Sequence, residues 1–197
     1  MSKIKIKNIS YKGWKETIEI SNSTIKILIV PEIGRIMHYG FLDGTNMFYE
    51  NEQLEGIKFN AGNYFQENNT NQAPNLGGNR VLPCSEEYFN ILTGSRHVPD
   101  PFINASSYEV TFLKNGVILK SPLSELLGIQ LERIITMSEN GTKVKIQQKL
   151  TKKTAAKNNL KTLLLDEKSE IGGSTIFQNS EHVKINDQNS STWLENE

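Results

Sequence analysis

The chain has 197 residues and a formal net charge of zero, because 22 basic and 22 acidic residues balance. This length suits one all-β domain, since sandwiches and barrels often run to roughly 200–250 residues. No apolar run approaches the roughly 18 residues of a spanning helix, and the N-terminus MSKIKIKNIS has no apolar signal segment. One cysteine, Cys84, cannot form an internal disulfide. We therefore expect a cytoplasmic globular protein without a membrane partner.

Short runs of β-branched and apolar residues predict β-strands along most of the chain. These runs lie at 4–9, 24–30, 35–42, 108–113, 117–119, 129–136 and 142–150. The connections Asp43-Gly44, Asn115-Gly116 and Asn140-Gly141 tolerate the positive φ angles of a type I′ turn, which joins antiparallel neighbours. Helix signals are weak, and a helix over residues 154–165 is about as well supported as a strand that begins at Leu160. The pattern predicts an all-β protein, an antiparallel β-sandwich.

The charge balance changes near residue 166. Seven lysines and no acid lie between Lys143 and Lys161, whereas residues 166–197 hold seven acids and two lysines. The lysine run lacks the aromatics and arginines of a nucleic-acid site, so a solvated strand face and linker is the preferred interpretation, without a nucleic-acid partner. We therefore divide the chain into a domain at 1–165 and an acidic polar extension at 166–197, whose last ten or so residues should fray.

The segment 75–101 is long, has little periodicity and is rich in polar side chains. A structureless connection of this length inside a compact domain is usually a functional loop. Its glycines, Gly77 and Gly78, can bring the backbone close to a ligand. The polar residues that follow are Asn79, Arg80, Arg96, His97 and Asp100. We interpret this segment as a polar ligand site.

Several segments together resemble a known superfamily. Residues 30–51, VPEIGRIMHYGFLDGTNMFYEN, combine a strand, a turn, a second strand and an Asp-Gly connection, and NLGGNRVLP, VPDPF and SPLSELLGIQLERIITMSENGTKVKIQQKLTK follow in this order. They resemble an uncharacterised bacterial branch of the aldose 1-epimerase (galactose mutarotase) superfamily, over roughly residues 3–150. The resemblance implies a galactose mutarotase-like super-sandwich, incomplete here because members are usually longer. It also implies a sugar or sugar derivative as ligand and no cofactor.

The activity that this resemblance implies is the interconversion of sugar anomers. The reaction requires a carboxylate that removes the proton of the anomeric hydroxyl and an acid that protonates the ring oxygen. His97 is the candidate acid, because an unperturbed pKa of about 6.5 suits proton exchange near neutrality. A loop histidine bonded to backbone is the alternative, and no residue here can be assigned as the base. The alternative to an isomerase is therefore a carbohydrate-binding protein without catalysis, or a degenerate, truncated β-sandwich protein of this superfamily without either activity.

Four residues are candidate sugar contacts. The Arg80 guanidinium can bind two hydroxyls or a carboxylate, although a buried arginine that ties the loop to a sheet is the alternative. Asp100, between two prolines, is either a hydroxyl acceptor or a turn former. Asn79 is a weaker candidate. Arg133 shares a strand face with apolar residues, so it is either a substrate clamp or half of a buried ion pair.

A zinc site is not expected, while a calcium site built from loop oxygens stays open at this point. The three histidines and the single cysteine stand at no ligand spacing. His38 lies within a predicted strand, where a structural histidine is the ordinary interpretation.

Overall fold

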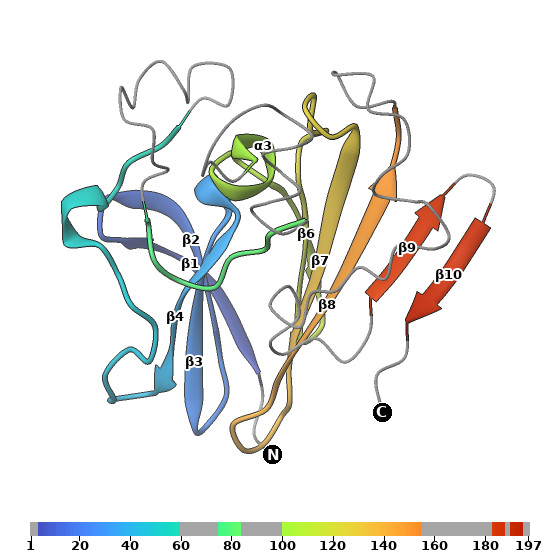
Figure 1. Cartoon of the computed structure of the whole chain (residues 1–197). Coiled ribbons are helices and arrows are strands. Elements are labelled where there is room, and N and C mark those ends of the chain that lie inside the picture. The colour runs from blue at the N-terminus through green and yellow to red at the C-terminus, as the bar shows by residue number, and fades with distance from the viewer. Residues whose placement is uncertain (1–3, 60–74, 84–99, 155–182, 188–189, 195–197) are drawn as a thin grey trace.

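The computed structural model describes residues 4–59, 75–83, 100–154, 183–187 and 190–194, and these are mostly β-structure with few helices. The first sheet is antiparallel, in the order β1-β2-β3-β4. Its strands are β1 (Lys5–Tyr11), β2 (Trp14–Ser21), β3 (Ile25–Val30) and β4 (Arg35–Phe41). Figure 1 shows this sheet in blue beside the second sheet.

The second sheet contains four antiparallel strands that follow one another in sequence. They are β5 (Glu109–Leu113), β6 (Gly116–Lys120), β7 (Ile129–Met137) and β8 (Val144–Lys152). Two further strands, β9 (Val183–Asp187) and β10 (Ser190–Leu194), extend this sheet beyond β8, and β9 pairs with β8 in parallel. The structure thus forms a strand within the last ten residues, where the sequence predicts a frayed end.

The helices are single turns. They are the 3-10 helices η1 (Pro31–Ile33) and η2 (Glu52–Leu54) and the α-helix α3 (Pro101–Asn104). In Figure 1, α3 lies at the upper end of the two sheets. None of the helices in the described ranges is long and apolar enough to cross a membrane.

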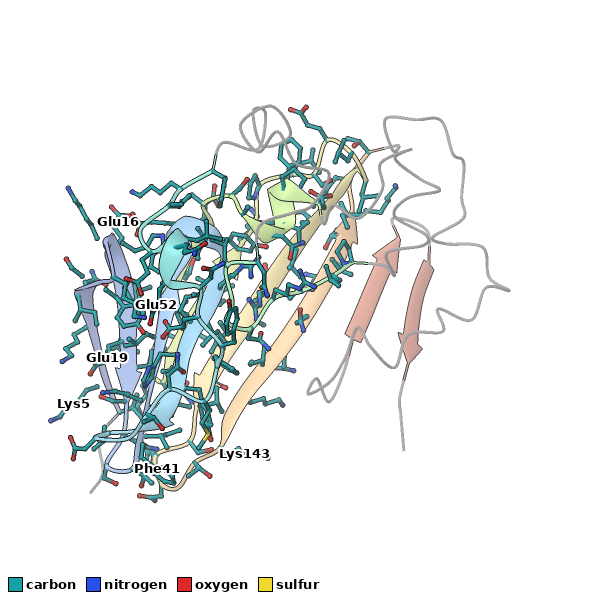
Figure 2. All side chains as sticks on the ribbon, turned by 60° about the vertical axis from the view of Figure 1, so that its left-hand side comes forward. Lys5, Glu16, Glu19, Phe41, Glu52 and Lys143 are labelled. Carbon is teal, nitrogen blue, oxygen red and sulfur yellow. The ribbon has the colours of Figure 1, made fainter. Side chains whose placement is uncertain are left out.

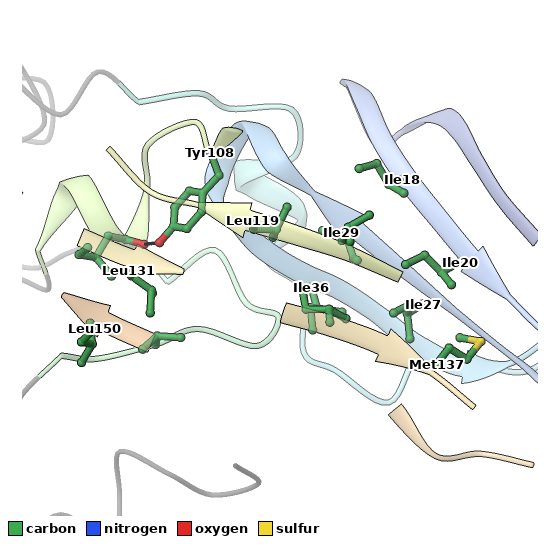
Figure 3. Close-up of a cluster of buried hydrophobic side chains, with 14 of the residues drawn as sticks. Ile18, Ile20, Ile27, Ile29, Ile36, Tyr108, Leu119, Leu131, Met137 and Leu150 are labelled. Atoms are coloured by element: carbon green, nitrogen blue, oxygen red, sulfur yellow. Dashed lines mark hydrogen bonds between the residues drawn. The ribbon is translucent and has the colours of Figure 1, made fainter. Parts of the chain in front are cut away.

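The two sheets share one apolar core, which explains why both are stable together. Strand β7 alternates strictly between buried and partly exposed residues, so one face is apolar along its whole length. Figure 3 shows Ile29 of β3 beside Leu119 of β6, and both sheets contribute side chains to the same buried cluster. Full burial of each such side chain stabilises the fold by about 1.5–3 kcal/mol. On the outer side of the first sheet, charged residues such as Lys5 and Glu16 point to solvent (Figure 2).

The seven strands predicted from the sequence are present, and besides β9 and β10 one further strand was not predicted, β2. Its start, Trp14 to Glu16, is interrupted by two charged residues, and the turn before it has no Asn-Gly or Asp-Gly pair. That turn uses Lys12 at φ 47° and Gly13 at φ 92°, the positive-φ pair that was expected elsewhere.

The three predicted type I′ turns have other geometries. Between β5 and β6, Gly116 already pairs with Leu113, so the two turn residues come just before it. Six residues separate β7 from β8, and of the predicted pair only Gly141 has positive φ. Asp43-Gly44 forms a turn after β4, but no named strand follows it before η2. Two of the three connections therefore join antiparallel neighbours as predicted, and the third does not.

Candidate functional site

Residues 77–80 form a short segment beside β4. The amide of Asn79 donates to the Ile36 carbonyl at 2.8 Å, and the amide of Gly78 donates to the Tyr49 carbonyl at 2.9 Å. Isolated bridges pair Asn79 with Ile36 and Gly77 with Glu50. In Figure 1 the green trace of residues 75–83 runs from the first sheet towards the second. The segment predicted to be structureless is therefore held by backbone hydrogen bonds where the structure describes it.

The two glycines of this segment allow close contact with the protein's own backbone. Gly77 has φ 83° and Gly78 has φ 68°, a region that residues with a side chain rarely adopt. A Cβ atom on Gly77 would lie 2.2 Å from the Tyr49 carbonyl oxygen, and one on Gly78 would lie 2.6 Å from that of Ile36. The space beside these glycines is thus filled by the backbone of Tyr49 and of Ile36, whereas the sequence analysis expected a ligand there.

Arg35, which was not among the predicted site residues, fixes one end of the segment. Its side chain is 2% exposed, and Nη1 donates to the Gly77 carbonyl at 2.7 Å. Nε and Nη2 donate to the Asn104 carbonyl at 3.2 and 3.0 Å, which links the segment to the end of α3. The sequence contained a signal for this buried role, because Arg35 is a charged residue at the start of a largely apolar strand, directly after the PEIG turn.

Arg133 fixes the other end. Nη1 donates to the Gly34 carbonyl at 2.9 Å, and Nη2 donates to the side-chain oxygen of Asn79. The side chain is fully buried, as its position on the apolar face of β7 predicts. Nε has no hydrogen-bond partner, and Arg133 forms no ion pair with any residue that the structure describes. Burial lowers the pKa of this guanidinium, while nearby Tyr108 acts in the opposite direction.

Asp100 is the N-cap of α3. Its Oδ1 accepts from the amides of Phe102 at 2.9 Å and Ile103 at 3.4 Å, and Pro101 stands at the first helical position. Its Oδ2 accepts from the hydroxyl of Ser124. Burial raises the pKa of Asp100 to about 6, although these hydrogen bonds oppose the rise. Both carboxylate oxygens are engaged within the protein, which favours the turn-forming role over a direct sugar contact.

Tyr108 joins the turn before β4 to α3. Its amide donates to the Pro31 carbonyl at 2.9 Å, and its hydroxyl donates to the Ile103 carbonyl at 2.6 Å. Its ring lies directly against Gly34, where a Cβ atom would come within 2.2 Å. Burial raises the pKa of the phenol, which therefore stays protonated near neutral pH. Neither Tyr108 nor Ser124 was predicted as part of this region, because their neighbours in space are distant in sequence.

Arg80 differs from the two buried arginines. It is exposed, and its guanidinium forms no hydrogen bond or ion pair with any described residue. Neighbouring Asn79 is partly buried, and its side-chain oxygen is already bound by Arg133. The structure thus joins Asn79 and Arg133 by hydrogen bonds, with Arg80 the next residue along the chain, and gives Asp100 a capping role. His97 lies outside the described residues.

In the described ranges, no group of three or more His, Cys, Asp and Glu side chains could hold a metal ion. His38 is buried in β4, and burial lowers its pKa. Its Nε2 has no hydrogen-bond partner.

No protein-family model, no curated protein and no solved structure matches this chain. Any function must therefore be argued from the residues themselves.

Proposed function

We propose that this chain is a carbohydrate-binding protein of the aldose 1-epimerase-like kind, and that Arg80 contacts the sugar. The ligand would be a small sugar or sugar derivative. An exposed guanidinium is suited to this role because its planar fork donates to two hydroxyls of one ring.

The observation that carries the proposal is the contrast between the backbone of residues 77–80 and the Arg80 side chain. The backbone is held at Gly77 by Arg35 and at Asn79 by Arg133 and β4. The side chain of Arg80 has no partner among the described residues. A rigid segment that presents a free donor group loses little entropy when it binds a ligand, which favours affinity.

The arrangement of the first sheet is compatible with the resemblance. Residues 30–51 form the end of β3, the turn η1, strand β4 and a following turn, in the order that the resemblance implies. Two antiparallel sheets around a shared core are also what a galactose mutarotase-like sandwich would require. This likeness concerns architecture, so it supports a sugar ligand by analogy only, and the site carries the argument.

Anomer interconversion is an extension of the same proposal, with His97 as the acid. The described geometry supports binding more directly than catalysis, because Asp100 has a pKa suited to proton transfer but both its oxygens are occupied. Polarimetry with fresh anomers of several aldoses tests this extension, and a rate no faster than buffer would restrict the function to binding.

The binding proposal is tested by Arg80→Ala, with Lys114→Ala as the control. Lys114 is also exposed and cationic, but it lies in the turn between β5 and β6. A sugar that binds the wild type should bind Arg80→Ala about 1.5–3 kcal/mol more weakly, the range for a hydrogen bond to a charged group. Its melting temperature should be nearly unchanged, and Lys114→Ala should bind normally. A sharp fall in the melting temperature of Arg80→Ala would instead identify Arg80 as a structural residue.

A further inference from the structure

We infer that the outer edge of β5 pairs with β5 of a second copy of this chain, so that the second sheets of two molecules join into one continuous sheet. This inference goes beyond the proposed function and does not depend on it. It rests on the outward-facing backbone of β5, on exposed Phe112, and on a register in which the strand is complementary to itself.

Two other sheet edges are protected from a further strand. The edge of β4 is covered by the chain itself, because the amides of Met47 and Asn79 donate to carbonyls of β4. The edge of β1 carries Lys5 and Lys7, and its register with β2 shifts before Tyr11. Edge lysines and an irregular register both discourage pairing with another strand.

Strand β5 lacks this protection. Its residues Glu109–Leu113 include no lysine or proline, and their register with β6 is regular. Among the described strands only β6 pairs with β5. Phe112 lies directly opposite fully buried Val117, so it is on the core side of the sheet, yet it is 54% exposed. The edge of β5 therefore leaves part of the apolar face uncovered.

The backbone groups of Val110 and Phe112 point away from β6. Because only two residues separate Leu113 from Gly116, these two form the hydrogen-bonded pair that closes the hairpin. Hydrogen-bonded and non-bonded pairs alternate along an antiparallel ladder, so the amides and carbonyls of Val110 and Phe112 face outward. They form no hydrogen bond with any described residue. A further strand would supply partners for all of these groups.

One antiparallel register of two β5 strands pairs all of them. It places Val110 of each copy opposite Phe112 of the other, with exposed Thr111 opposite itself on the two-fold axis. A register with Val110 opposite itself would need the amide of Tyr108, which already donates within its own chain. A register with Phe112 opposite itself would need Lys114, which lies in the turn. The pairing of Val110 with Phe112 occurs twice and covers the apolar surface of both copies.

The first experiment is sedimentation velocity of the full chain, of Phe112→Lys and of the control Phe41→Lys. Phe41 is a similarly exposed aromatic, at 51%, but it lies at the end of β4. One strand per copy makes a small interface, so concentrations from about 10 µM to about 1 mM are compared. We expect the wild type to dimerise at the upper end, Phe112→Lys to dimerise at least about tenfold more weakly, and Phe41→Lys to match the wild type.

The second experiment tests the register and does not depend on Phe112→Lys folding normally. Thr111→Cys and Glu109→Cys are oxidised mildly, each combined with Cys84→Ser so that only the new thiol reacts. Opposite residues have Cα atoms about 4.5–5.5 Å apart, within the range of a disulfide. Glu109 would instead stand opposite Leu113, roughly 13 Å along the strand from its own counterpart. We expect a disulfide-linked dimer of Thr111→Cys and none of Glu109→Cys.

A wild type that stays monomeric at the highest concentration would overturn the inference and leave the edge of β5 to another partner. A dimer that Phe112→Lys does not weaken would also overturn it, because the two copies would then meet at another surface. Equal cross-linking of Glu109→Cys and Thr111→Cys would contradict the register on which the inference rests.

Discussion

The carboxyl group of Asp100 gives the clearest test of the electrostatics at the end of the two sheets. The perturbation is Asp100→Asn, which keeps the shape and removes the charge. The amide oxygen can still accept from the amides of Phe102 and Ile103, so the cap of α3 is preserved. The new NH₂ group replaces the oxygen that Ser124 binds and can donate to the same hydroxyl.

The expected magnitude follows from the pKa of Asp100, which burial raises from its usual 3.8 to about 6. A carboxyl whose pKa is higher in the folded state binds its proton more tightly when folded. Its contribution to stability is therefore complete below pH 3.8 and is lost as the pH rises through about 6. Since one pKa unit corresponds to about 1.4 kcal/mol, the loss is about 3 kcal/mol.

The assay is urea unfolding of the wild type and Asp100→Asn between pH 3 and pH 8. The two proteins should have similar free energies of unfolding at the lowest pH, and the variant should become more stable than the wild type by up to about 3 kcal/mol above pH 6. Asp100→Ala is the control, because it lacks the cap as well as the charge and should be about 0.5–2 kcal/mol less stable than Asp100→Asn at every pH. If the difference in free energy of unfolding between wild type and Asp100→Asn does not change with pH, burial does not raise the pKa of Asp100 and the reasoning is refuted.

Three further predictions concern the fold and catalysis. Gly34→Ala should lower the free energy of unfolding by more than about 2 kcal/mol, because the new Cβ would meet the Tyr108 ring. Gly141 has a similarly positive φ but open space around it, so Gly141→Ala should lower the free energy of unfolding by only about 1 kcal/mol. Similar melting curves for the two variants would contradict the packing of Tyr108 against Gly34. Far-ultraviolet circular dichroism should be dominated by β-structure, and a helix content above about one third would be incompatible with the fold. If the protein interconverts anomers, His97→Asn should slow the reaction by about 10²–10⁴ with binding retained, and an unchanged rate would exclude His97 as the acid.

Much of the strand pattern could be read from the sequence because it depends on local alternation. In β7, apolar residues at every second position predict both the strand and the inward direction of Arg133, and both are observed. Strand β2 was missed because Lys15 and Glu16 interrupt its apolar pattern near the start. The turns were less predictable, since Lys12 adopts positive φ while Asn115 does not.

The partners of the candidate residues could not be predicted, because they depend on segments distant in sequence. Arg133 binds Asn79 and Gly34, which are 54 and 99 positions away. The capping role of Asp100 was accessible in principle, because an aspartate before a proline is a typical helix start. The hydrogen bond between Asp100 and Ser124 could not be predicted, because β5 and β6 separate the two residues in sequence.

The most direct test of the central claim is to observe the arginine side chains while a sugar binds. The chain has four arginines, at positions 35, 80, 96 and 133, so the Nε–H signals in a ¹H–¹⁵N spectrum can be assigned by single substitutions. Titration with a binding sugar should shift and sharpen the Arg80 signal, because an exposed guanidinium becomes protected from exchange with water. The Arg35 signal should move little, because its guanidinium is already buried against the Gly77 and Asn104 carbonyls. A sugar that binds without changing the Arg80 signal would contradict the account.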